Sequence, residues 1–230
     1  MTARADDTGV LAALAGDRSL LNRSSTVERV AEILRERIIE GLLRPGERLS
    51  EDAIGRALGV SRNTLRESFR LLSHERLVVH ELNRGVFVRT LSAEDVTDLY
   101  RVRKLIEPAA LDGDVPVSEE GLRPLRAAIA AAANAAAEGR GADVGTANMR
   151  FHQALAALAG SARIDTIMRQ LLAELRLVFH VMDRPGEFHA PYLDRNREIL
   201  GLLERGELQQ ARQALLDYLA DAEARLLAAY

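Results

Sequence analysis

The sequence predicts a mostly α-helical protein, with an N-terminal winged helix-turn-helix followed by an all-α antiparallel helical bundle. Three observations predict this fold class. Apolar residues recur at helical spacing over most of the 230 residues, two short β-type runs occur between residues 77 and 88, and the charge balance changes near residue 90. Residues 26–90 hold twelve arginines and ten acidic residues, whereas residues 91–230 hold sixteen basic and twenty-one acidic residues. This change indicates two domains with different partners.

Composition excludes several classes of protein. The chain has no cysteine, so it has neither disulfides nor thiolate sites. Hydrophobic residues make up 47% and charged residues 28% of it, which is typical of a folded chain. The alanine-rich run 127–137 is too short to cross a bilayer, so we expect a cytoplasmic protein without membrane contact. Residues 1–25 show no sustained period and are interpreted as a mobile N-terminal tail.

The elements of the DNA-binding domain, residues 26–90, follow from start and stop signals. A first helix begins near Val27 and stops at Gly41. Ser50 caps a short second helix that Gly59 ends, and Ser61 caps a third helix. Two β-type runs at 77–80 and 86–88 follow, joined by a turn over residues 83–85. These elements form three helices and a hairpin.

The second domain, residues 91–230, has a purely helical pattern. Six helices fit between breaks near residues 112–116, 139–141, 160, 185–186 and 206. Every segment has an apolar face and none has a strand pattern, so an antiparallel bundle is expected.

The third helix predicts contact with DNA. Leu65, Phe69 and Leu72 recur at helical spacing and face inward. The major groove accepts one helix, and arginines one turn apart on it can reach base edges and phosphates together. The opposite face of this helix carries Arg62, Asn63, Arg66 and Arg70.

Short polar residues and the wing extend this prediction. Asn63 and Thr64 lie in the first turn and can reach a base edge or a phosphate. Arg84 in the hairpin turn can reach the adjacent minor groove. The alternative is a solvated basic face, but the helix-turn-helix spacing and the wing favour DNA.

Residues 58–67, Leu-Gly-Val-Ser-Arg-Asn-Thr-Leu-Arg-Glu, resemble the signature of the GntR family of bacterial transcription regulators. The Arg84-Gly85 turn, Pro45-Gly46 and Leu49-Ser50-Glu51 match it too. The resemblance implies that Arg62 and Arg66 contact bases and phosphates. With the residues of this resemblance included, the candidate DNA-binding residues are Glu51, Ser61, Arg62, Asn63, Thr64, Arg66, Arg70, Arg84 and Gly85. The chain departs from the family pattern at residues 63–65 and at Arg76. Glycine is usual at the position of Arg76, and both differences bear on the operator sequence.

The second domain resembles the FCD subfamily, a helical effector-binding and dimerisation domain. Residues 100–103 with Glu107, and residues 151–155, resemble its motifs. Many members bind a divalent metal through one aspartate and three histidines. The corresponding residues here are Asn148, His152, Asn196 and Tyr218.

This ligand set predicts that no metal or other cofactor is bound. An amide oxygen is a weak donor to a transition metal and a phenol is protonated at pH 7, so one neutral histidine holds no tight site. His180 and His189 are weaker substitutes, and a packed or exposed role is favoured for each.

The remaining amides, phenol and imidazole suit direct binding of a small polar effector. The candidate effector residues are Arg103, Asn148, His152, Asn196 and Tyr218. Arg103 either binds the carboxylate of an acidic effector or pairs with Glu107 one turn later, and the sequence leaves both open. Phe179, Phe188 and Tyr192 either line the cavity or pack.

We therefore expect an effector-controlled repressor that binds a palindromic operator in double-stranded DNA as a homodimer, since a twofold pair doubles the contacts of one module. The first alternative is a constitutive DNA-binding regulator without an effector. The second is a metal-dependent enzyme in the helical bundle, which the depleted ligand set disfavours. No catalytic residues are predicted.

Overall fold

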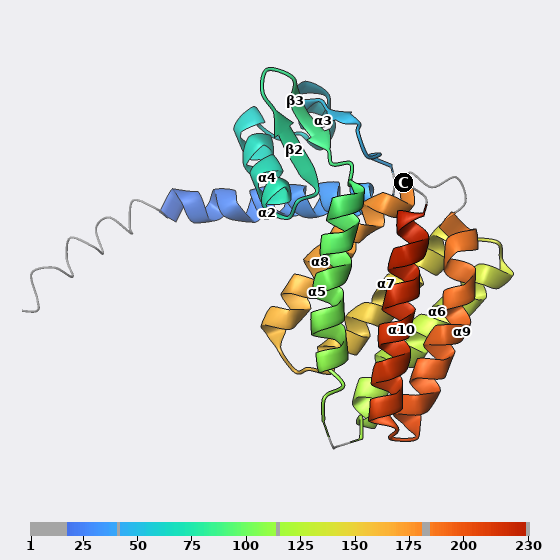
Figure 1. Ribbon diagram of the computed structural model, residues 1–230. Helices are drawn as coiled ribbons and strands as arrows, with labels where there is room; N and C mark the ends of the chain where they lie inside the picture. The colour runs from blue at the N-terminus through green and yellow to red at the C-terminus, as the bar shows by residue number, and fades with distance from the viewer. Residues whose placement is uncertain (1–17, 41, 114–115, 181–184, 229–230) are drawn as a thin grey trace, which may run out of the picture. The chain divides into compact units, whose positions relative to one another are not determined.

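The computed structural model describes residues 18–40, 42–113, 116–180 and 185–228. The chain divides into two compact units, residues 1–89 and 90–230, and each is described by itself. Helices dominate both units, and a small sheet belongs to the first (Figure 1). The predicted fold class, a winged helix-turn-helix followed by a helical bundle, is confirmed.

The first unit combines three helices with a three-stranded antiparallel sheet. In chain order its elements are α2 (Arg18–Ile39), β1 (Arg48–Leu49), α3 (Glu51–Leu58), α4 (Arg62–His74), β2 (Val78–Glu81) and β3 (Gly85–Val88). The strands are ordered β1-β3-β2, and β3 pairs with both neighbours. Strands β2 and β3 are the predicted hairpin. Strand β1 was not predicted, because two residues are too short to show an alternating pattern.

The core of this unit lies between α2, α4 and one face of the sheet. On α2 the buried residues Val30, Ala31, Leu34 and Ile38 share one face. They meet Leu65, Phe69 and Leu72 of α4, and this confirms the predicted inner face. Helix α3 contains no fully buried residue, so it depends on α4 for its position.

Helix α2 starts earlier than predicted. It begins at Arg18, so residues 18–25 are helical and the prediction of an unstructured tail over 1–25 is wrong for them. No glycine or proline occurs between residues 17 and 40, and extending an existing helix backwards is inexpensive. Residues 1–17 lie outside the described residues.

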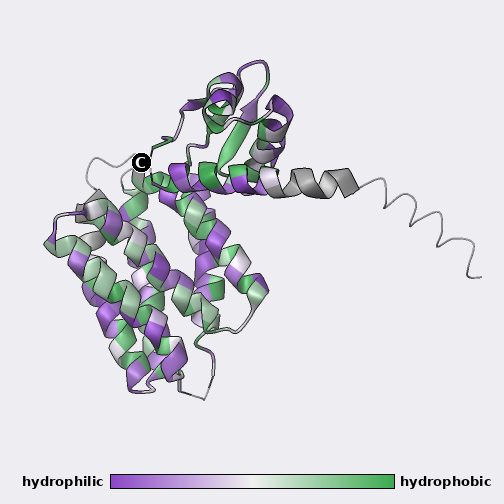
Figure 2. Ribbon diagram, turned by 180° about the vertical axis from the view of Figure 1, so that it is seen from behind, coloured by the Kyte–Doolittle hydropathy of each residue, from purple (hydrophilic) through white to green (hydrophobic). Residues whose placement is uncertain are grey.

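The second unit is an antiparallel bundle. Its helices are α5 (Ala93–Ala109), α6 (Glu119–Ala137), α7 (Gly141–Ala157), α8 (Ala162–His180), α9 (Pro185–Glu204) and α10 (Leu208–Leu227). Helix α7 contacts α5, α6, α8 and α9, while α10 packs on α5 and α9. Figure 2 shows hydrophobic and hydrophilic residues alternating around these helices. Within the described ranges, no helix is both long and apolar enough to cross a membrane.

Two local features refine the sequence pattern. The break predicted near residues 185–186 is confirmed as a helix boundary, with Pro185 as the first residue of α9, where its missing N–H costs nothing. The alanine-rich stretch packs along one face of α6, through Ala128, Ala132 and Ala135.

Candidate nucleic-acid interface and buried polar cluster

Side-chain caps and a left-handed glycine fix the turn between α3 and α4. Ser50 Oγ accepts a hydrogen bond from the N–H of Ala53 at 3.3 Å, and Ser61 Oγ accepts one from the N–H of Thr64 at 3.1 Å. Gly59 closes α3 with a φ of +64°, a value that favours glycine. The predicted caps are therefore confirmed. The Ser61 and Thr64 hydroxyls also bond each other at 2.8 Å, which holds both at the start of α4.

The exposed face of α4 carries the predicted row of arginines. The side chains of Arg62, Arg66 and Arg70 are 73%, 64% and 72% exposed, respectively, and Asn63 is exposed beside them. The opposite side of the helix is anchored by apolar residues and by Ser68, whose hydroxyl donates to the carbonyl oxygens of Val27 and Thr64. The helix thus presents a basic face on a rigid support.

Each of these arginines pairs with an acid of its own unit. A terminal nitrogen of Arg62 lies 2.9 Å from Asp52 Oδ1, and one of Arg70 lies 2.7 Å from Glu67 Oε1. Arg66 pairs differently, because its Nε donates to both carboxylate oxygens of Glu51 at 3.0 and 3.1 Å. The exposed pairs of Arg62 and Arg70 contribute little stability, so an external anion can replace their acids.

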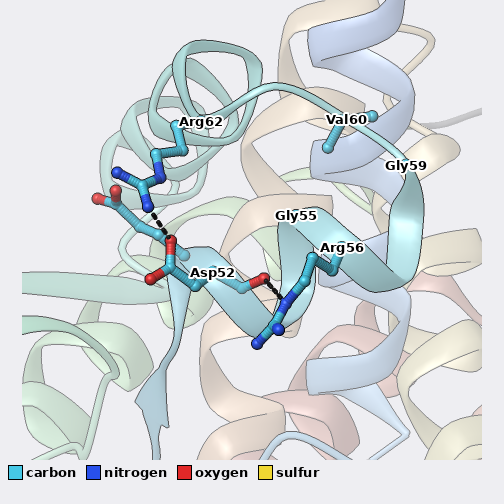
Figure 3. A pocket seen from close by; sticks show the side chains of 7 residues that line it. Asp52, Gly55, Arg56, Gly59, Val60 and Arg62 are labelled. Carbon is cyan, nitrogen blue, oxygen red and sulfur yellow. Dashed lines mark hydrogen bonds and ion pairs between the residues drawn. The ribbon is translucent and has the colours of Figure 1, made fainter.

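An open hollow lies between α3 and the start of α4 (Figure 3). Asp52, Arg56, Arg62 and the turn residues Gly59 and Val60 line it, and Figure 3 shows Arg62 directed at Asp52. Glu51 also lines the hollow, so its walls carry two acids and two arginines beside the basic face of α4.

The wing is the hairpin of β2 and β3. Arg84 in its turn pairs with Glu81, and its guanidinium lies 5.3 Å from the ring centre of Phe87. Gly85 has a φ of +111°, and a Cβ there would lie 3.2 Å from Nε of Arg48. The backbone conformation therefore favours glycine, and any other residue would also displace the Arg48 side chain by a few tenths of an ångström.

Arg48 is an exposed arginine that sequence reasoning missed. It lies on β1 opposite Phe87, two residues before the Ser50 cap of α3. Its guanidinium lies against Gly85, at the start of β3, so it is part of the surface beside the wing turn. The only signal for it in the sequence is a basic residue directly before the matched Leu49-Ser50-Glu51.

The backbone conformation at Arg76 explains why glycine is usual at this position. Arg76 has a φ of +58°, in the left-handed region, directly after the end of α4. Glycine adopts this conformation without strain, which explains why glycine is usual here. The difference therefore affects the backbone between α4 and β2, and our interpretation that it bears on the operator finds no support in this geometry.

In the second unit, the five predicted effector residues come together in a buried polar cluster. Asn148 Oδ1 accepts hydrogen bonds from Asn196 Nδ2 at 2.7 Å and from the Tyr218 hydroxyl at 3.0 Å. The ring of His152 packs edge-on against Tyr218. Helices α5, α7, α9 and α10 therefore deliver these side chains to one place.

Glu107 joins the two halves of the cluster. Its carboxylate accepts a hydrogen bond from Arg103 Nε at 2.6 Å, and its other oxygen lies 2.6 Å from His152 Nδ1. Both Arg103 and Glu107 are buried, so the pairing alternative for Arg103 is realised. Glu107 was predicted only as a partner of Arg103, because its contact with His152 spans 45 residues.

Three buried polar atoms of the cluster have no hydrogen-bond partner in the described part of the chain. They are Arg103 Nη2, His152 Nε2 and Asn196 Oδ1. Buried polar groups are nearly always hydrogen-bonded, and an unpaired one costs about 1–3 kcal/mol. These three atoms are therefore the polar groups of the cluster that a ligand or an ordered water would have to satisfy.

Burial and charge set the protonation states. Burial is the largest single influence on Glu107 and would raise its pKa, but the charge of Arg103, the interaction with His152 and the hydrogen bonds to both together lower that pKa, so the carboxylate is ionised. Burial lowers the pKa of His152, so the ring is neutral and donates its Nδ1 proton to Glu107. Burial also raises the pKa of Tyr218, which keeps its phenol protonated.

Aromatic rings extend from this cluster through the domain. Tyr192 lies 4.7 Å from Tyr218, Phe188 lies 5.3 Å from Tyr192, and Phe179 lies 5.3 Å from Phe188, measured between ring centres. All three are buried, so they form packed core beside the cluster. The side chains of His180 and His189 lie outside the described residues.

A capped recognition helix with an exposed arginine row, a wing and a separate helical unit define a DNA-binding transcription regulator. The family model described as bacterial regulatory proteins, gntR family, matches residues 26–88, and that of the FCD domain matches residues 98–221. The chain belongs to the GntR family, and its second unit is an FCD domain. Because both domains and the relatives are those of regulators, the protein is not an enzyme.

Similar proteins agree with this assignment. The crystal structure of a GntR transcriptional regulator from Rhodococcus sp. RHA1 is 51% identical over 90% of this chain and 99% of its own, with a TM-score of 0.86. The HTH-type regulator YdhC of Bacillus subtilis is 25% identical over 80% of this chain and 83% of its own. The gluconate operon transcriptional repressor of the same species is 35% identical over 44% of this chain and 42% of its own.

Proposed function

We propose that this regulator binds a palindromic operator as a homodimer and acts as a repressor in the cytoplasm. The observation that carries the proposal is the exposed row of Arg62, Arg66 and Arg70 on the capped helix α4. One module reads only a short half-site, whereas a twofold pair reads two and doubles the phosphate contacts. The gluconate operon relatives are named repressors, which supports the direction of control.

Individual residues have distinct roles in this proposal. Arg62 and Arg66 read base edges in the major groove, with Asn63 beside them, while Arg70 binds a phosphate. Ser61 and Thr64 orient the start of α4, and Arg84 and Gly85 place the wing in the minor groove. Arg48 is exposed against Gly85 at the wing turn, so we assign it a phosphate beside the groove that the wing enters.

Selection of bound fragments from genomic DNA tests this proposal, followed by footprinting on the recovered sites. The expected result is a protected inverted repeat, with two protomers per duplex by light scattering. Equal binding of genomic and random DNA by the folded protein would refute it.

A small acidic effector controls the repressor through the buried polar cluster. Arg103 Nη2 offers a charged donor to a carboxylate, and Asn196 Oδ1 and neutral His152 Nε2 offer acceptors to a hydroxyl or ammonium group. A small hydroxy acid or amino acid carries both kinds of group, a carboxylate for Arg103 and a donor for His152 or Asn196. Its binding would shift the relative orientation of the two reading heads.

The effector binds directly and without a metal. Asn148 Oδ1 is already occupied by two donors, and Tyr218 keeps its proton, so neither is an anionic ligand. His152 Nε2 and Asn196 Oδ1 would remain, and two neutral donors do not fit a tight divalent site. Metal analysis of tag-free protein should show well under one equivalent, and stoichiometric zinc or nickel would overturn this inference.

A constitutive regulator is the second candidate, and the neutralisation of Arg103 by Glu107 favours it. A thermal-shift screen with hydroxy, amino and sugar acids separates the two candidates. Stabilisation that Asn196→Ala abolishes supports an effector in this cluster. No stabilisation by any acid supports the constitutive regulator.

A further inference from the structure

The four arginines of the predicted interface are held by their acids in two different ways. Arg62, Arg70 and Arg84 each pair through a terminal nitrogen of the guanidinium. Arg66 is held through Nε, by both oxygens of Glu51. Among the described residues, no hydrogen bond engages either terminal nitrogen of Arg66.

The acid that holds Arg66 is itself fixed in place. Glu51 is the first residue of α3, directly after the Ser50 cap, and its side chain is only 30% exposed. Arg66 lies fifteen residues later on α4 and is 64% exposed, between Arg62 and Arg70 on the outer face. A sheltered carboxylate on one helix thus orients an exposed guanidinium on the next.

This geometry matches the chemistry of guanine recognition. Arginine reads guanine through two parallel donors that meet O6 and N7 in the major groove. If Nε is held from behind, the two terminal nitrogens form the outward end of the planar guanidinium. An arginine that is already oriented loses less side-chain freedom when it binds.

We propose that Glu51 is a positioning residue that makes Arg66 the guanine-reading residue of the recognition helix. Arg62, in contrast, must release Asp52 from a terminal nitrogen before it can form a two-point contact with a base. Arg70 and Arg84 exchange their acids for phosphates. This inference rests on the proposed function, in which α4 enters the major groove.

If Glu51 positions Arg66, its removal affects DNA binding differently from the removal of a negative charge alone. Removing a carboxylate from a DNA-facing surface reduces repulsion and strengthens binding to any sequence. Losing the orientation of Arg66 weakens only the discrimination between bases. Glu51→Ala should therefore raise non-specific affinity and lower specificity at the same time.

The test measures dissociation constants for operator DNA recovered by genomic selection and for duplexes in which each G·C pair of a half-site is replaced in turn. Arg66→Ala should lose about 5- to 150-fold discrimination at one G·C pair, the range expected for a two-point contact. Glu51→Ala should lose about 3- to 10-fold at the same pair. The double variant should match Arg66→Ala in discrimination, because Glu51 affects discrimination only through Arg66.

Two further variants control for charge and hydrogen bonding. Glu67→Ala removes the matched acid of Arg70 on the same helix and should raise non-specific affinity with discrimination unchanged. Glu51→Gln retains one oxygen that accepts from Nε, so it should recover part of the discrimination. Thermal unfolding of every variant confirms that the fold is intact.

The outcomes separate this inference from the proposed function. Wild-type discrimination in Glu51→Ala, together with its loss in Arg66→Ala, would overturn the positioning role and leave the proposed function standing. Unchanged discrimination at every base pair in Arg66→Ala would remove Arg66 as a reader. If Arg62→Ala also left the discrimination between base pairs unchanged, the recognition helix itself would be misassigned.

Discussion

Arginine–carboxylate pairs occur in both units of this protein, in opposite environments. On the recognition helix the arginines are about two-thirds exposed or more, whereas Arg103 and Glu107 in the helical bundle are almost completely buried. An exposed pair contributes about 0–1 kcal/mol, but breaking a buried one costs about 3–5 kcal/mol. The same chemistry therefore makes an exchangeable surface in one unit and a fixed core in the other.

The largest effect is expected from breaking the buried pair. Glu107→Ala leaves Arg103 buried without its partner and should lower the free energy of unfolding by about 3–5 kcal/mol. Denaturant titration followed by circular dichroism measures this loss. The matched exposed variant, Glu67→Ala, should change stability by less than about 0.5 kcal/mol. Equal effects in the two variants would contradict the comparison.

Removal of an exposed arginine should affect DNA binding rather than stability. Arg62→Ala should reduce the preference for operator over non-specific DNA by about 1–3 kcal/mol, because it removes base contacts. Fluorescence anisotropy with both duplexes measures the preference. Arg101→Ala, an exposed arginine of the second unit, is the control and should have no effect.

The buried cluster should make stability depend on pH. The pKa of His152 is lowered in the folded protein, so the unfolded chain binds a proton first and stability falls as the pH drops below about 6.5. Glu107, whose pKa is also lowered, adds a further loss only below about 4.5. Between pH 4.5 and 6.5, His152→Gln should therefore reduce the dependence of the free energy of unfolding on pH. The reduction is at most that of one proton, or about 1.4 kcal/mol per pH unit. Parallel denaturation curves for the two proteins across this range would contradict the neutral state of His152.

A smaller gain is expected from relieving backbone strain at the end of α4. Arg76→Gly should raise the free energy of unfolding by about 0.5–1 kcal/mol, because glycine adopts the left-handed conformation without strain. Differential scanning calorimetry measures the change. Arg56→Gly, inside α3, should lower stability by about 1 kcal/mol. An unchanged operator preference in Arg76→Gly would show that this position acts on the backbone alone.

The smallest expected effect concerns the phosphate contact at the wing. Arg48→Ala should weaken binding to all sequences alike and reduce the slope of log affinity against log salt by about 1. Affinities measured over a series of salt concentrations give this slope. A change in base preference would instead assign Arg48 to base reading.

Local signals explain how much of the fold was predictable. Capping serines, the glycine that ends α3 and the apolar spacing of α4 act within one or two helical turns, so the pattern of residues defines them. Strand β1 exists only because β3 lies beside it, and its two residues carry no periodic signal. The predicted start of α2 was wrong because, without a glycine or proline to stop it, the sequence does not mark where the helix begins.

The sequence by itself determined the helices, the hairpin, the exposed row of arginines and which polar residues the helical bundle contains. Only the tertiary structure decided which acid holds which arginine, that Arg48 crosses Gly85, and that Glu107 bridges Arg103 and His152. The physical reason is distance along the chain. Periodicity and capping act over a few residues, whereas most of these contacts join side chains fifteen or more residues apart, which only packing brings together.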